Sequence, residues 1–169
     1  MTLTAKILAR FAWNWSDGAT DNTKLEVDKN LSLGPEQSQA QAVWHVEDEV
    51  LLSGNSVTLD LTALVRTVLG ASLTTALVGV RGILIYSSDA SVGTLLVGAS
   101  GGNEWHDPFA TSGQALSIPP DGAAMVAAPL LGWPVDGSHK LLKLKASGGD
   151  VTYSIAIIGT TSSSSSSGA

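Results

Sequence analysis

The sequence predicts an all-β protein whose antiparallel strands form a sandwich or a barrel. Apolar and polar residues alternate with period two in several segments, as they do in strands that bury one face. Clusters of turn-forming residues separate these segments, among them Ser53-Gly54-Asn55, Pro119-Pro120-Asp121-Gly122 and Ser147-Gly148-Gly149-Asp150. Their spacing is typical of sandwiches and barrels.

The first clear strand pattern lies between residues 24 and 33, where Leu25, Val27, Leu31 and Leu33 face one way. Alternation recurs over residues 57–61 and 142–145, and it is cleanest in the last strand, over residues 151–157. The stretch Leu77–Tyr86 is apolar on both faces apart from Arg81. It is therefore predicted to be a central strand that is covered on both sides.

One short helix is also predicted. Its apolar face consists of Leu61, Leu64, Val65, Val68 and Leu69, which follow helical spacing. Flanking residues of this segment suit its two ends, since Asp60 can cap the start and Gly70 can end it. We place the helix as a crossover that closes one end of the sandwich.

The chain length predicts a single domain with a flexible extension. Its 169 residues, of which 44% are hydrophobic, suit one domain with a real core. We assign residues 1–159 to the β-sandwich domain. Residues 160–169 are nearly all serine and threonine, so we expect a flexible C-terminal tail that buries no apolar surface.

Composition and charge argue against several classes of function. The formal net charge is −6, which disfavours nucleic acid as a partner. No apolar stretch reaches the length of a membrane span, and Met1–Lys6 does not resemble the start of a secretory signal. There is no cysteine, and charged residues make up only 14% of the chain. Sparse charge suggests a surface that partners cover in part.

Two segments carry residue types that could do chemistry. His45, Glu47 and Glu49 would share one face of a strand, but no further histidine or cysteine has ligand spacing, so we expect an acidic edge and no metal. Residues 103–109 gather Trp105, His106 and Phe109 in a loop. This loop either binds a sugar or plugs the end of the sandwich, and plugging is the favoured interpretation. We expect no catalytic residues and no cofactor.

The five tryptophans are many for this length, and some of them suit an interface. Trp13 and Trp15 would share a face if they lie on a strand, where interface and core roles are equally open. The candidate interface residues are Trp13, Trp15, Trp105, Phe109 and Trp133.

The order of features along residues 1–159 resembles that of small structural proteins from tailed phages and prophages. The segments that carry the resemblance are Thr4-Ala5-Lys6-Ile7, Leu31-Ser32-Leu33-Gly34, Gln39-Ala40-Gln41-Ala42-Val43-Trp44-His45, Val57-Thr58-Leu59-Asp60-Leu61, Val80-Arg81-Gly82-Ile83-Leu84-Ile85, Leu96-Val97-Gly98-Ala99, the Trp105-Pro108-Phe109 loop, the Pro120-Asp121-Gly122 turn, Gly132-Trp133-Pro134-Val135 and the closing strand 151–159. The acidic run Glu47-Asp48-Glu49 and the serine-rich tail depart from the pattern.

The resemblance implies a virion protein with a jelly-roll-like antiparallel β-sandwich, which decorates and stabilises a phage capsid as a cement protein. The implied partners are the major capsid protein and copies of the chain itself, in a homotrimer. The implied location is the capsid surface, after synthesis in the host cytoplasm.

Two other hypotheses belong to different functional classes. One is a phage receptor-binding or carbohydrate-binding sandwich that would use Trp105, His106 and Asp107. The other is a jelly-roll enzyme with a metal, which is disfavoured because His45, His106 and His139 are far apart in sequence.

Overall fold

The computed structural model describes residues 3–16, 20–98 and 101–162, without the side chains of residues 11, 13–16, 20–23 and 68. It confirms the all-β class. The strands are β1 (Ala5–Ser16), β2 (Thr20–Leu33), β3 (Gln39–Ala40), β4 (Ala42–Leu51), β5 (Ser56–Asp60), β6 (Leu64–Val68), β7 (Ala71–Thr75), β8 (Gly79–Ser87), β9 (Thr94–Gly98), β10 (Ala115–Ile118), β11 (Ala123–Ala127), β12 (Trp133–Pro134), β13 (Leu141–Ser147) and β14 (Val151–Thr160).

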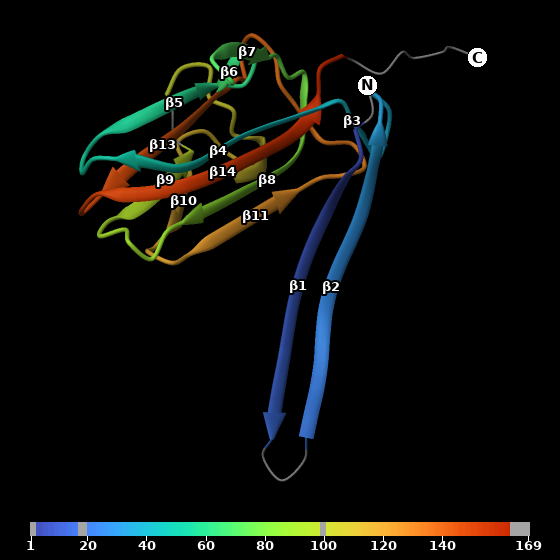
Figure 1. The fold of residues 1–169 in the computed structure, drawn as a ribbon, viewed down its shortest axis with the longest axis vertical. Helices are drawn as coiled ribbons and strands as arrows, with labels where there is room; N and C mark the ends of the chain where they lie inside the picture. Colours follow the sequence, from blue (N-terminus) through green and yellow to red (C-terminus); the bar gives the residue numbers. More distant parts are fainter. Residues whose placement is uncertain (1–2, 17–19, 99–100, 163–169) are drawn as a thin grey trace.

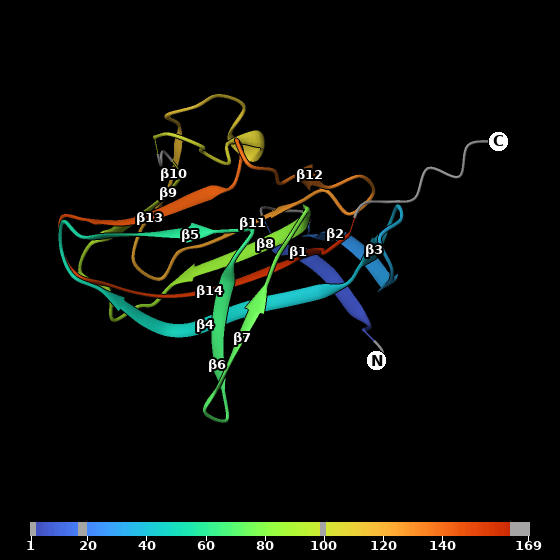
Figure 2. The same ribbon diagram turned by 90° about the horizontal axis from the view of Figure 1, so that it is seen from above.

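Two antiparallel sheets form the body of the molecule. One sheet has the strand order β11-β8-β14-β4, with β12 added against β8, and the other has the order β10-β9-β13-β5. The two sheets lie face to face as layers (Figures 1 and 2). A β-sandwich is therefore the architecture, as the alternation of the sequence predicted.

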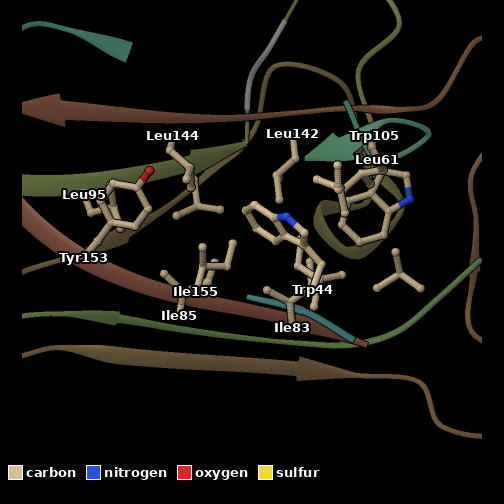
Figure 3. Close-up of a cluster of buried hydrophobic side chains, with 14 of the residues drawn as sticks. Trp44, Leu61, Ile83, Ile85, Leu95, Trp105, Leu142, Leu144, Tyr153 and Ile155 are labelled. Carbon is tan, nitrogen blue, oxygen red and sulfur yellow. The ribbon is translucent and has the colours of Figure 1, made fainter. Parts of the chain in front are cut away.

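The core fills the space between the two layers. Leu142 and Leu144 of β13 face Ile83 and Ile85 of β8 and Ile155 of β14, and all five side chains are buried (Figure 3). The alternating residues of β13 and β14 that the sequence placed on a buried face are the ones that line this core. Period-two alternation thus located the core strands correctly.

The helix predicted from residues 61–69 is wrong, because this segment starts an antiparallel hairpin of β6 and β7. Leu69 and Gly70 form its two-residue turn with φ of 50° and 81°, which is the left-handed backbone of a type I′ turn. The β-branched Val65 and Thr67, with Thr74 opposite Val65, favour a strand. A short helix would also have needed more packing than this edge offers.

The β6–β7 hairpin projects from the sandwich in Figure 2, and hydrogen bonds hold both its strand β6 and the Asp60–Thr62 turn that precedes it. The indole of Trp44 donates a hydrogen bond to the carbonyl of Val65 at 3.0 Å. Asp60, the predicted helix cap, accepts from the backbone N–H and hydroxyl of Thr62 and pairs with Lys140 at 2.8 Å. Among the described residues, the helical structure is the 3₁₀ turn η1 (Asp107–Phe109), which is too short to cross a membrane.

The C-terminal strand runs slightly further than the predicted domain boundary. Thr160 is the last residue of β14 and is buried. The backbone N–H groups of Thr161 and Ser162 both donate to the side-chain carbonyl of Gln41, at 2.9 and 3.0 Å. Most of the predicted serine tail, residues 163–169, lies outside the described part of the chain.

Strands β1 and β2 form a long antiparallel hairpin, here called the arm, which projects away from the sandwich (Figure 1). Its strands have 12 and 14 residues, so it extends about 40 Å at the usual rise of a strand. The sequence predicted strand β2 but assigned its apolar face to a core. Only the root of that face is buried, at Leu31, and the rest lies on the arm.

Arg81 fixes the root of the arm to the sandwich. The register between β14 and β8 shifts here, from Ile158↔Gly82 to Gly159↔Val80, so Arg81 is the extra residue of a bulge. Its side chain is 5% exposed. Its guanidinium donates to the carbonyls of Gln39 at 3.0 Å and Glu36 at 2.9 Å, and also to those of Pro35 and Leu130.

This arrangement explains how an arginine fits into an otherwise apolar strand. Burial lowers the pKa of Arg81, but the carbonyl dipoles around it stabilise the charge that burial disfavours. Three of the four acceptors belong to the segment that joins the arm to β4. Arg81 therefore fixes the point at which the arm leaves the sheet.

We expect Arg81→Met to lower the free energy of unfolding by about 3 kcal/mol, because charged hydrogen bonds are lost and partly buried carbonyls lose their donor. Urea unfolding measures this change. The matched control is Arg66→Met in the β6–β7 hairpin, which should shift stability by less than about 0.5 kcal/mol. Equal effects of the two substitutions would contradict the anchoring role.

Candidate interaction surface

One face of the arm is polar, and its charges are paired. Lys6 lies 2.7 Å from Asp28, and Glu26 accepts from Lys24 at 3.1 Å and lies 3.9 Å from Arg10. All these groups are solvent-exposed, so each pair contributes little to stability. Their effect is to give the arm one face that is well suited to remain in water.

The opposite face of the arm is mostly apolar, with Lys29 opposite Ile7, and beyond the root of the arm the chain itself does not cover this face. Leu25 is 67% exposed and Val27 is 46% exposed. In the register of the arm these residues lie opposite Phe11 and Ala9, so apolar positions of the two strands adjoin. An isolated two-stranded hairpin is marginally stable in water. An uncovered apolar face of this kind indicates an interaction site.

The root of the apolar face packs against the sandwich. Ile7 and Leu31 are buried together with Ala40, and Met125 and Ile158 of the five-stranded sheet pack against them. Gly82 permits the approach, because a β-carbon at that position would meet the Cδ1 atom of Ile7 at 3.2 Å. The arm thus begins on the outer face of this sheet, which is the face turned away from the core.

The same outer face continues into an apolar area, here called the outer patch, formed by Val43, Leu84, Tyr86 and Ala156. Leu84, in the central strand β8, is 50% exposed. A groove of about 340 Å³ lies between the arm root and the patch, and a second hollow of about 570 Å³ shares Val43, Leu84 and Ala156 with it. The hydroxyl of Tyr86 donates to Asp121 at 3.0 Å, and this hydrogen bond raises the pKa of Tyr86.

The outer patch corrects the prediction that residues 77–86 are covered on both sides. The central position of β8 is confirmed, since it lies between β11 and β14. On its outer side, however, the chain covers only the end near Gly82, where the arm root packs. A sequence that is apolar on both faces predicts that a strand is covered, but it does not specify which chain covers it.

Trp105, Phe109 and Trp133 come together at one end of the sandwich. Trp105 is 0% exposed, and its indole N–H donates to the carbonyl of Pro134 at 3.0 Å. The ring of Trp133 meets it edge-on at 6.1 Å, and Phe109 packs on the same cluster. Trp105 lies within the core in Figure 3, and the three aromatics together plug this end of the sandwich. Trp105 has no free ring face to stack on a sugar, and its burial leaves none of its surface for a partner.

Trp13 and Trp15 both lie in β1, as the strand interpretation of that segment requires. In the register of the arm they are opposite Thr23 and Asp21. Their side chains are outside the described part of the chain. Their role in an interface therefore stays a prediction.

The candidate metal segment does not form a cluster. A bulge in β4 changes the pairing from Glu49↔Tyr153 to Val46↔Ile155 and interrupts the alternation that would align His45, Glu47 and Glu49. The Nδ1 atom of His45 lies 3.4 Å from the Oε1 atom of Glu47. Within the described ranges, no three histidine, cysteine or acidic side chains are grouped as metal ligands.

The structure also brings together polar residues whose proximity the sequence did not reveal. The rings of His106 and His139 are 5.3 Å apart, although 33 positions separate them in the sequence. Nearby in sequence, Glu104 is buried and accepts from the hydroxyl of Ser112 at 2.7 Å and the N–H of Gly113. Asp136 accepts from the N–H groups of Ser138 and His139, which lower its pKa. These contacts order loops.

Comparisons with models of known protein families, with curated proteins and with solved structures find no match. A proposal for the function therefore rests on the geometry of the chain and on the order of features in its sequence. The arm and the outer patch are the features of the described surface that indicate a function most directly.

We expect Trp105→Ala to destabilise the protein by about 3–5 kcal/mol, because it leaves a large cavity in the core. Thermal unfolding followed by circular dichroism measures the effect. Trp133→Ala, at a half-buried position, should cost less. A Trp105→Ala protein as stable as the wild type would contradict the plug and would reopen the sugar-binding hypothesis.

Proposed function

We propose that the chain is a structural protein of a phage virion, which decorates and stabilises the capsid without catalysing a reaction. The observation that carries this proposal is the arm, which presents an uncovered apolar face on one side and paired charges on the other. Such an element gains stability only when another protein covers it. Its geometry therefore supports an assembly protein.

The sandwich supports the same proposal by the way it uses its polar groups. Asp60 remains an acceptor with a lowered pKa. Although burial opposes that shift, hydrogen bonds from Lys140 and Thr62 outweigh it. Asp136 accepts from the backbone N–H groups of Ser138 and His139 in its own turn, and Glu104 accepts from Ser112 and Gly113 within the connection between β9 and β10. These carboxylates act as structural acceptors, which fits a protein whose role depends on buried area.

Decoration of a shell is the form of assembly that the family resemblance favours. A protein that binds only the assembled shell stabilises that shell by mass action. The major capsid protein and copies of the chain are the proposed partners. A homotrimer on the capsid surface is the proposed state, since repeated subunits favour closed symmetric assemblies and the resemblance implies three copies.

Mass spectrometry of phage particles purified from cells that encode the chain tests this function. We expect the chain to be present in the particles at a copy number within a few-fold of that of the major capsid protein. A tag-free recombinant copy added to particles that lack it should bind saturably and raise the temperature at which they release DNA.

The control for this experiment is the soluble fraction of the same lysate after the particles are removed. A chain that stays in the soluble fraction and is missing from purified particles would contradict the proposed function. Saturable binding without any gain in particle stability would contradict the stabilising role.

A further inference from the structure

We propose that the arm of one copy lies across the outer patch of a second copy, with the apolar face of the arm against Val43, Leu84 and Ala156. This inference deepens the proposed function and rests on it for the statement that the chain acts as an assembly. The second copy's arm covers the outer patch, and the outer patch in turn covers the apolar face of that arm.

Continuity with an existing contact is the first argument. The root of the arm already packs on the outer face of its own sheet, through Ile7 and Leu31 against Met125 and Ile158. The outer patch adjoins this contact, since one groove contains residues of both. Beyond its root the arm leaves the sandwich, so its own patch stays uncovered (Figure 1). An arm from another copy can extend the same type of packing.

The distribution of charge is the second argument. Residues 3–33 contain four basic and four acidic side chains, whereas the rest of the chain contains five basic and eleven acidic ones. The net charge of −6 is therefore carried by the sandwich, and Glu47 and Asp48 border the hollow beside the outer patch. Two acidic sheets that met face to face would repel each other. A neutral arm can cover the patch without this penalty.

The area that the contact would bury is the third argument. Beyond its root, from Leu8 to Ser16 of β1, the arm extends about 30 Å, and a ribbon of that length and about 10 Å wide offers about 300 Å² on one face, or about 600 Å² counting both partners. One such contact is smaller than a stable specific interface, while two reach about 1,200 Å², the lower end of the standard size. Each copy is therefore expected both to give an arm and to receive one, as in a closed ring.

Single cysteines test the contact directly, because the natural chain contains none. One protein carries Val27→Cys on the arm, and a second carries Leu84→Cys on the outer patch. Each chain then has one thiol, so any mixed disulfide joins two copies. After mixing and mild oxidation, we expect the mixed dimer to form at least tenfold more than with the control pair.

The control pair combines Val27→Cys with Lys145→Cys, an exposed position on β13 of the other sheet. Equal yields from the two pairs would overturn the proposal. A product dominated by the disulfide between two copies that both carry Val27→Cys would also overturn it, because it would indicate that arms associate with one another. All three positions are exposed, and unchanged unfolding midpoints verify that the variants fold.

A second measurement compares the two faces of the arm. We expect Leu25→Ser/Val27→Ser to weaken self-association at least tenfold, and Lys24→Ser/Glu26→Ser on the polar face to change it less than threefold. Dilution series followed by light scattering give both values. Equal weakening by the two pairs of substitutions would contradict docking through the apolar face.

These experiments use the purified chain in solution, so they are independent of the particle experiment. A chain that is found in virions but forms no arm-to-patch disulfide would overturn the arm exchange and leave the decoration function standing. A chain that forms the disulfide but is missing from virions would overturn the decoration function and leave the arm exchange standing.

Discussion

The buried guanidinium of Arg81 is the interaction on which the shape of the molecule depends. It binds the carbonyls of Pro35, Glu36 and Gln39, which belong to the segment between the arm and the sandwich, and that of Leu130 from a separate loop. A charge in this place requires a full set of acceptors. The segment that supplies them is thereby held against the sheet, and the arm begins from a fixed point.

A fixed root explains why the apolar surface is divided between two places. The arm leaves the sheet after Ile7 and Leu31 have packed on it, so Leu25 and Val27 lie beyond the reach of their own sandwich. Leu84 of the sheet is left half-exposed for the same reason. Two apolar surfaces of the chain are therefore uncovered, one on the arm and one beside a shallow groove, and the proposed assembly would bring them together.

The sequence predicted the strands and the core well because period-two alternation directly reflects burial on one face. The strands at 142–145 and 151–157 follow this rule, and their apolar residues line the core. The prediction failed at residues 61–69, where the apolar positions fit both a helix and a hairpin. The Leu69–Gly70 turn and the hydrogen bond from Trp44 select the hairpin.

The candidate site was only partly predictable, for a physical reason. Alternation in β2 is the same whether its apolar face meets the chain's own core or another molecule, so a projecting arm cannot be distinguished from a core strand. Two bulges, at Arg81 and near Asp48, also reset the alternation locally. The deep burial of Trp105 depends on the contact with Pro134, which lies 29 positions away. Trp13 and Trp15 lie in β1 of the arm, but their spacing left interface and core roles equally open, and their side chains lie outside the described part of the chain.

The mass of the purified wild-type chain in solution tests whether the arm and the outer patch make this chain assemble with itself. Light scattering at several concentrations measures that mass. We expect a stable closed oligomer, with the mass of three copies of the 17.3 kDa chain. A monomer at every concentration would contradict it, because the apolar surfaces of the arm and the patch would then remain in water.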